Sequence, residues 1–100
     1  MSQIYSVDEI KNIIHSFDNI LKSEYKADKF YLFGSYARGE QTSDSDIDLL
    51  VEFTTDADLF SLIDLKEFLN GIFNKNIDLG TPNGLKPRIK NSILNEAILI

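Results

Sequence analysis

The sequence predicts an α/β domain in which helices cover a small mixed β-sheet. Three stretches lead to this prediction. Apolar residues recur at the period of an amphipathic helix over residues 7–23, alternate at the two-residue period of a strand over residues 47–53, and return to a helical face over residues 59–73. Because a helix buries its apolar stripe against another layer, strands separated by helices imply a sheet with helices packed on one or both faces.

The first half of the chain is predicted to form a helix, a strand, a short helical turn and a second strand. Ser6 and Glu9 have the spacing of a capping box, which places the beginning of a helix directly after Ser6. A following apolar and aromatic run stops at Gly34-Ser35, as a strand does when it enters a tight turn. The predicted elements are a helix at Val7–Ser23, a strand at Lys29–Phe33, a helical turn near Tyr36–Gly39 and a strand at Ile47–Phe53.

The second half is predicted to add two helices and two short strands. Asp56 and Asp58 are placed to cap the helix over residues 59–73. Pro87 suits the first turn of a further helix, where no N–H is needed. We also expect a strand at Ile77–Leu79, a loop at Pro82–Gly84, a buried side of the last helix formed by Ile89, Ile93 and Leu94, and a final short strand within Ala97–Ile100.

Composition and charge narrow the kinds of partner. The 100 residues fit one domain, 1–100, and 43% hydrophobic with 26% charged residues is typical of a folded globular chain. A formal charge of -6 repels nucleic-acid phosphates and anionic lipids, so we expect no direct nucleic-acid partner and no membrane partner. The absence of cysteine excludes disulfides and thiolate metal sites. Since the first residues contain no apolar run, we expect a cytoplasmic protein.

The residues that carry chemistry are a Gly-Ser turn and a pair of aspartates. Asp46 and Asp48 are two positions apart at the beginning of a strand, so their carboxylates project from one face and repel each other. A divalent cation reverses that repulsion, and Mg²⁺ prefers such oxygen ligands. Gly34 lets backbone N–H groups approach a phosphate closely, and Ser35 adds a hydroxyl donor. Together they predict a site for a nucleoside triphosphate and its metal ion.

A second Asp-x-Asp pair acts as an internal control. Asp56 and Asp58 have the same spacing, but they lie between a strand and a helix, where helix capping explains them. The pair at Asp46 differs in context, because it follows a strand, a Gly-Ser turn and a polar loop and then opens an apolar strand.

Arg38 is a candidate for neutralising triphosphate charge. The alternative interpretation is an ordinary exposed arginine on a helix.

The stretch from Phe33 to Val51 resembles the signature of the DNA polymerase β-type nucleotidyltransferase superfamily, specifically its minimal nucleotidyltransferase (MNT) branch. The resemblance implies the polymerase β-like nucleotidyltransferase fold. It also implies that the Gly-Ser turn holds the triphosphate and that the Asp-x-Asp pair binds two metal ions. These ions would be Mg²⁺, with Mn²⁺ as a possible substitute. The third carboxylate of the superfamily maps onto Asp78 in Asn76-Ile77-Asp78-Leu79, where it would share the catalytic metal and help to deprotonate the incoming hydroxyl.

The resemblance implies a function as well. The MNT branch is similar to the antitoxin half of HEPN/MNT modules, in which the MNT protein transfers AMP from ATP to a HEPN ribonuclease. We therefore expect transfer of AMP to a hydroxyl acceptor, a tyrosine of a partner HEPN toxin. Two alternatives stay open: an antitoxin that neutralises by binding alone, and a free-standing transferase that modifies a small hydroxylated molecule.

Overall fold

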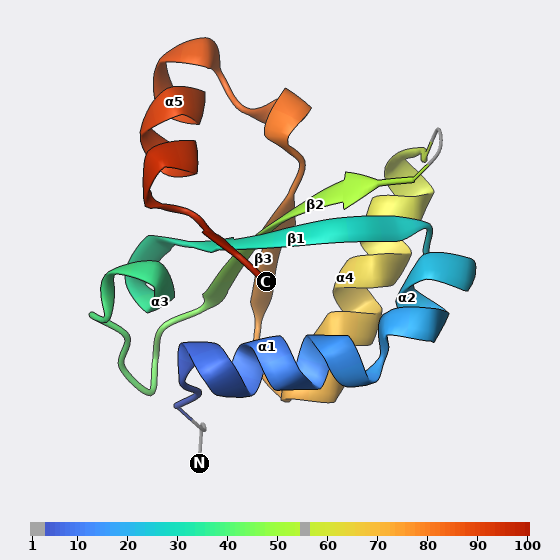
Figure 1. Cartoon of the computed structure of the whole chain (residues 1–100), viewed down its shortest axis with the longest axis horizontal. Coiled ribbons are helices and arrows are strands. Elements are labelled where there is room, and N and C mark those ends of the chain that lie inside the picture. Colours follow the sequence, from blue (N-terminus) through green and yellow to red (C-terminus); the bar gives the residue numbers. More distant parts are fainter. Residues whose placement is uncertain (1–3, 55–56) are drawn as a thin grey trace.

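The computed structural model describes residues 4–54 and 57–100, and over these ranges the chain forms one four-stranded sheet between helices (Figure 1). The strands lie in the order β3-β2-β1-β4. β1 (Ala27–Phe33) pairs antiparallel with β2 (Ile47–Phe53) and with β4 (Ile98–Leu99), whereas β2 pairs parallel with β3 (Ile77–Gly80). The predicted small mixed sheet is therefore confirmed.

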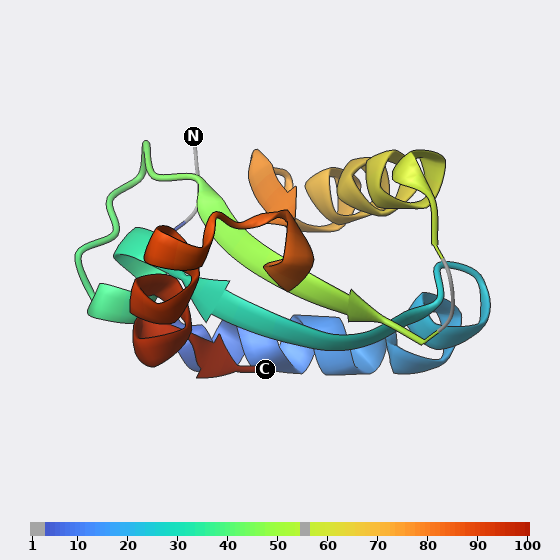
Figure 2. The same cartoon turned by 90° about the horizontal axis from the view of Figure 1, so that it is seen from above.

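Helices cover both faces of this sheet. The helices α1 (Val7–Ser16), α2 (Asp18–Ser23) and α4 (Leu59–Phe73) lie on one face, and α5 (Pro87–Glu96) lies on the other (Figures 1 and 2). Two shorter helices, α3 (Gly34–Arg38) and the 3₁₀ turn η1 (Pro82–Gly84), follow β1 and β3. Within the described ranges, no helix has the length and apolar character needed to cross a bilayer.

The helix predicted over residues 7–23 is divided in two at Phe17. Its predicted beginning is confirmed, since Glu9 N–H donates to Ser6 Oγ (3.1 Å) and Ser6 N–H donates to Glu9 Oε1 (2.9 Å). The Ser16 hydroxyl donates to the Ile13 carbonyl (2.6 Å), which is the acceptor that Phe17 N–H would use in a continuous helix. Phe17 N–H bonds to the Ile14 carbonyl instead (3.1 Å), so α1 ends at Ser16 and α2 begins at Asp18.

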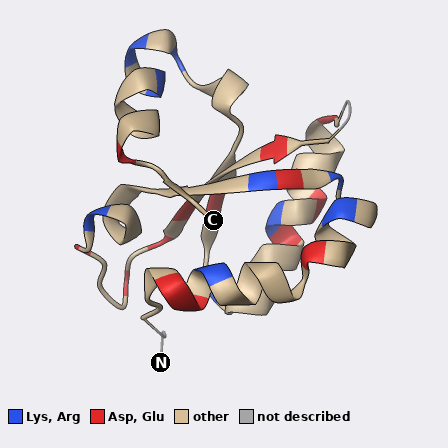
Figure 3. Ribbon diagram, in the orientation of Figure 1, with Lys and Arg blue, Asp and Glu red and all other residues tan. Residues whose placement is uncertain are grey.

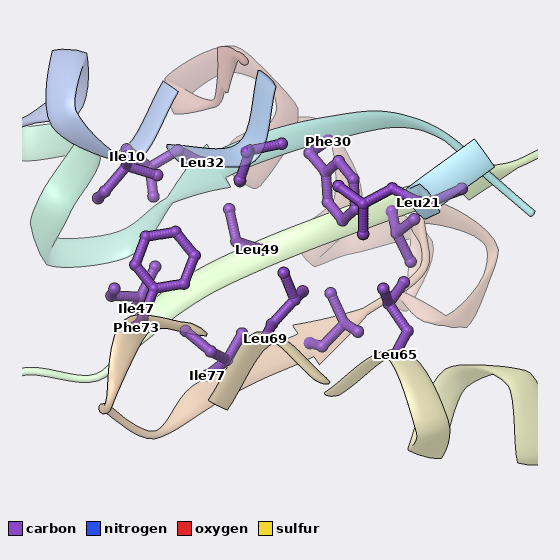
Figure 4. Packing of buried hydrophobic residues seen from close by; sticks show 14 of the residues in the cluster. Ile10, Leu21, Phe30, Leu32, Ile47, Leu49, Leu65, Leu69, Phe73 and Ile77 are labelled. Atoms are coloured by element: carbon purple, nitrogen blue, oxygen red, sulfur yellow. The ribbon is translucent and has the colours of Figure 1, made fainter. Parts of the chain in front are cut away.

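The main core lies between the sheet and the helices α1, α2 and α4 (Figure 4). Ile47, Leu49 and Val51 of β2 are fully buried in it, and they meet Ile10 of α1 and Leu69 of α4. Each such side chain contributes about 1.5–3 kcal/mol by leaving water. Because side chains alternate along a strand, this burial fixes the register of β2 and directs the residues in between toward the opposite face.

The second half of the chain follows the prediction with two differences. Asp58 caps α4 by accepting the Ser61 N–H (3.0 Å), and Pro87 occupies the first turn of α5; Asp56 lies outside the described residues. The predicted buried side of α5 is wrong, since no described residue of this helix is buried: 47% of Ile89 is exposed, and Ile93 and Leu94 are only half-buried. Figure 1 gives the reason: α5 begins away from the sheet and approaches it only toward its C-terminal end. The expected loop at residues 82–84 is wound into η1.

Candidate active site

Gly34 links β1 directly to α3 and is the most constrained glycine of the chain. Its φ of +70° belongs to the left-handed region, which residues with a Cβ rarely adopt. A Cβ built on Gly34 would overlap the Asp48 carboxylate and would stand 3.0 Å from Asp48 Cγ. Both the backbone conformation and the close approach of Asp48 therefore require glycine here.

Asp48 and Asp78 lie side by side on neighbouring strands. Asp48 is opposite Phe33 of β1 in the antiparallel ladder and opposite Asp78 of β3 in the parallel ladder. Adjacent strands are about 4.8 Å apart, so the two carboxylates share one face of the sheet near the points where β2 and β3 begin. Figure 3 shows the acidic segments of these two strands close together. Asp46 lies one residue before β2 and is exposed.

The electrostatics of Asp48 differ from those of an ordinary aspartate. Partial burial, together with the negative charges of Asp78 and Asp46, raises the pKa of the Asp48 carboxyl from 3.8 to about 6, and Arg38 opposes this rise. The protein's own groups thus leave the ionised form of Asp48 under-compensated. A bound cation would supply the missing positive charge.

The donor set fits a hard divalent cation. Asp46, Asp48 and Asp78 offer only carboxylate oxygens, the ligands that Mg²⁺ prefers, and the raised pKa marks where positive charge is lacking. Within residues 4–54 and 57–100, however, no three acidic, histidine or cysteine side chains are close enough to hold an ion as they stand. The structure therefore brings Asp48 and Asp78 together, and Asp46 would have to move toward this pair to complete a three-carboxylate site.

The two remaining predicted residues lie on α3. Ser35 is half-buried in the first turn, and its carbonyl accepts the Glu40 N–H (2.9 Å). Arg38 ends the helix, and its side chain is partly exposed. Its Nε lies 3.4 Å from Glu40 Oε1, and its Nη1 lies 3.4 Å from Glu96 Oε2 of α5. Exposed ion pairs of this kind contribute about 0–1 kcal/mol, so an anionic ligand can replace them. Arg38 is close enough to influence Asp48, but its guanidinium is paired with these carboxylates.

Two contacts that shape the loop before Asp46 were not predicted. Thr42 N–H donates to Ser45 Oγ (2.9 Å) and Ser45 N–H donates to the Thr42 carbonyl (3.1 Å), which closes a tight turn. Lys75 Nζ, from the turn before β3, donates to the Ser43 carbonyl (2.9 Å). The Thr/Ser spacing is a signal for the first contact. Nothing local in the sequence signals the second, because it joins segments 32 positions apart.

Most of the chain matches a known protein family. Residues 14–100 match the family described as Nucleotidyltransferase domain. Since the match spans most of the chain, the protein belongs to this family of nucleotidyltransferases, whose members generally use divalent metal ions.

Two relatives are similar to this chain over nearly their whole length. A Methanocaldococcus jannaschii protein named as a protein adenylyltransferase is 40% identical over 96 residues, which cover 95% of this chain and 98% of the relative. Protein adenylyltransferase MntA of Thermococcus cleftensis is 32% identical over 95 residues, which cover 95% of this chain and 96% of the relative. The enzymatic class expected from the sequence, a nucleotidyltransferase, is therefore confirmed.

Solved structures share the fold. One described as a minimal nucleotidyltransferase superposes with a TM-score of 0.80 at 32% identity and covers 97% of this chain and 98% of that chain. Another, described as a toxin-antitoxin with AMP-PNP, superposes with a TM-score of 0.68 at 25% identity and covers 92% of this chain and 69% of that chain. The predicted nucleotidyltransferase fold is confirmed by these likenesses.

Proposed function

We propose that the protein transfers AMP from ATP to a hydroxyl group of a partner protein and thereby neutralises that partner. One observation carries the proposal: the Gly34 turn packs directly against Asp48, which lies opposite Asp78. A backbone suited to phosphate and a pair of carboxylates suited to a metal ion thus occupy one place. Nucleotidyl transfer needs both.

Each predicted site residue has a distinct role in this proposal. Backbone N–H groups at Gly34 and the Ser35 hydroxyl hold the triphosphate, and Arg38 exchanges its exposed carboxylate partners for phosphate oxygens. Asp46, Asp48 and Asp78 would hold two Mg²⁺ ions, or two Mn²⁺ ions in their place. When bound, these ions would neutralise charge on the attacking and leaving oxygens.

The proposed transfer step is a displacement at the α-phosphorus of ATP in which Asp78 accepts a proton. The acceptor hydroxyl oxygen forms a bond to the α-phosphorus of ATP, the bond from that phosphorus to the bridging oxygen breaks, and pyrophosphate leaves. The hydroxyl proton passes to the Asp78 carboxylate, which is exposed and so within reach of an incoming side chain. Asp48, being less exposed, serves as a metal ligand rather than as the base.

We propose a HEPN-type toxin as the partner and a tyrosine as its acceptor residue. The names of the relatives support a protein acceptor, and the toxin-antitoxin structure with AMP-PNP supports a toxin partner and an adenine nucleotide. The formal charge of -6 favours a basic protein surface, because complementary potentials speed encounter.

Intact masses and cell protection test the proposal together. Wild-type protein incubated with its genetically adjacent HEPN-type partner, ATP and Mg²⁺ should add the mass of AMP to the partner and abolish its ribonuclease activity. Gly34→Asp would put a negative side chain where the phosphate must come, and Asp46→Asn would weaken metal binding; both should stop the mass change. Asp44→Asn removes an exposed loop carboxylate and should leave the mass change intact.

The outcome in cells separates three functions. If Gly34→Asp and Asp46→Asn still protect cells from the partner as wild type does, neutralisation works by binding alone and the transfer account is wrong. If the partner gains no mass while a small hydroxylated compound does, the protein is a free-standing transferase.

A further inference from the structure

Lys75 joins two segments that are distant in the sequence and meet at the candidate active site. It lies in the turn between α4 and β3, directly after Asn74, whose φ of 50° ends the helix. Its Nζ donates to the carbonyl of Ser43 (2.9 Å), which belongs to the loop between α3 and β2. The next residue of the same turn, Asn76, accepts the N–H of Ile47 (3.2 Å).

These two hydrogen bonds bracket Asp46. Ser43 comes three residues before it and Ile47 one residue after it, and both are bonded to the same short turn. That turn leads directly into β3, where Asp78 follows Lys75 by three residues. The segment from Ser43 to Ile47, which contains Asp46, is therefore hydrogen-bonded at both of its ends to the turn that precedes the strand of Asp78.

Electrostatics alone do not account for a lysine at this place. Residues 39–50 contain Glu40, Asp44, Asp46 and Asp48 and no Lys or Arg, so the loop has strong acidic character. An ammonium group near a cation site nevertheless repels the cation. If Lys75 acted only through its charge, it would weaken metal binding. Its hydrogen bond to the neutral Ser43 carbonyl indicates that Lys75 positions the loop. This role would strengthen metal binding, whereas its charge would weaken it.

We propose that Lys75 is a positioning residue that keeps the backbone of the Asp46 segment next to the turn before β3, so that the Asp46 side chain has less far to move to join the Asp48–Asp78 pair and the divalent cation binds more tightly. The proposal rests on the proposed function, in that it takes the three aspartates as the metal ligands. Asp46 is exposed and precedes the strand, so the ladder hydrogen bonds of β2 do not restrain it. Without Lys75, metal binding would have to order the loop first, and that ordering reduces affinity.

Titration with Mn²⁺ alone, in the absence of nucleotide, tests the proposal on the full chain. We expect Lys75→Met to weaken Mn²⁺ binding about tenfold, and Lys75→Arg, which keeps a donor, to stay within about threefold of wild type. Lys11→Met, which removes an exposed lysine of α1, is the matched control for lost charge and should leave Mn²⁺ binding unchanged. The metal-free melting temperature of Lys75→Met should stay within about 3 °C of wild type, since the contact is exposed.

The possible results are distinct. If Lys75→Met binds Mn²⁺ as tightly as wild type or more tightly, charge repulsion dominates and the positioning role is wrong. If Lys75→Arg is as weak as Lys75→Met, a donor at this position does not restore the site and the role is equally wrong. Absence of Mn²⁺ binding by the wild type would instead overturn the metal site of the proposed function, and the role of Lys75 with it.

Discussion

Asp48 and Asp58 each end an Asp-x-Asp pair, yet the fold gives them opposite environments. The Ser61 N–H and hydroxyl donate to Asp58 at the beginning of α4 (3.0 and 3.2 Å) and hold the pKa of its carboxyl below the usual range. Partial burial beside Asp78 and Asp46 raises the pKa of Asp48 to about 6. The spacing of two aspartates therefore carries no function by itself. The groups around each carboxylate decide whether the protein compensates its charge or leaves it to a ligand.

The difference has a consequence for stability. The compensated carboxylate of Asp58 stabilises the folded chain, because its ionised form is favoured by the native structure. The ionised carboxylate of Asp48 destabilises the metal-free chain, as is common where a site is kept ready for a ligand. Substitutions at the two regions should therefore change stability in opposite directions.

The largest effect should come from filling the space between the Gly-Ser turn and Asp48. Gly34→Ala places a Cβ against the Asp48 carboxylate and forces a left-handed backbone on alanine. Displacement of reacting groups by about 1 Å costs on the order of 100-fold in rate, and we expect AMP transfer to fall by at least about that factor. Single-turnover assays with radiolabelled ATP would measure it.

Gly71→Ala is the matched control for Gly34→Ala. Gly71 lies on the exposed side of α4, where an added Cβ would meet no other atom within 4 Å, and alanine favours helix. This variant should transfer AMP at the wild-type rate. Normal transfer by Gly34→Ala would mean that the close contact with Asp48 has no part in catalysis.

A smaller effect, on stability, is expected from Asp48→Asn in the metal-free protein. The folded-state pKa of Asp48 is raised above its unfolded value of 3.8, so the native state loses stability as the pH rises through about 6. Asparagine stays neutral and escapes this loss. At pH 7.5 in EDTA, we expect the variant to melt about 6 °C higher than wild type, after allowance for solvent screening at a partly exposed site.

The advantage of Asp48→Asn should disappear as the pH falls below about 4, where the wild-type carboxyl is protonated in both states. Asp44→Asn, on the exposed loop, is the control for removing one negative charge and should change the melting temperature little. A large drop for Asp48→Asn at pH 7.5 would show that the carboxylate has a structural role that outweighs its repulsion.

The smallest effect is expected at the other aspartate and with the opposite sign. Asp58→Ala removes the N-cap of α4, and loss of such a cap should lower the melting temperature by about 4 °C at pH 7. AMP transfer should be unchanged, because α4 begins at the end of the sheet away from α3 (Figure 1). Differential scanning fluorimetry and the transfer assay together check this. Loss of transfer at unchanged stability would break the contrast between the two aspartates.

Much of the fold was predictable because it depends on local patterns. The Ser6–Glu9 capping box, the alternation along β2 and the helical face of α4 each rest on neighbours in the chain, and each is confirmed. The break at Phe17 was not predictable from periodicity, since it depends on a serine hydroxyl that takes a backbone acceptor. The exposure of Ile89 depends on how far α5 rises from the sheet, which no local pattern encodes.

The candidate site was predictable to the extent that residue type carries its chemistry. The Gly-Ser turn and the Asp-x-Asp pair could be placed by spacing, and the strand register that sets Asp48 opposite Asp78 accounts for their proximity. The pairing of Arg38 with Glu96 and the bond from Lys75 to Ser43 connect positions 58 and 32 residues apart. Such contacts follow from tertiary packing, so no local pattern in the sequence indicates them.

The most direct test of the account is whether a metal ion is needed for the triphosphate to bind. Isothermal titration of ATP into the wild-type protein should give binding in Mg²⁺ buffer that is at least about tenfold tighter than in EDTA, since in the proposed site Asp46, Asp48 and Asp78 would hold a metal ion that offsets the charge of the triphosphate. Equal ATP affinity in the two buffers would contradict the claim that these carboxylates form a metal-dependent nucleotidyl-transfer site.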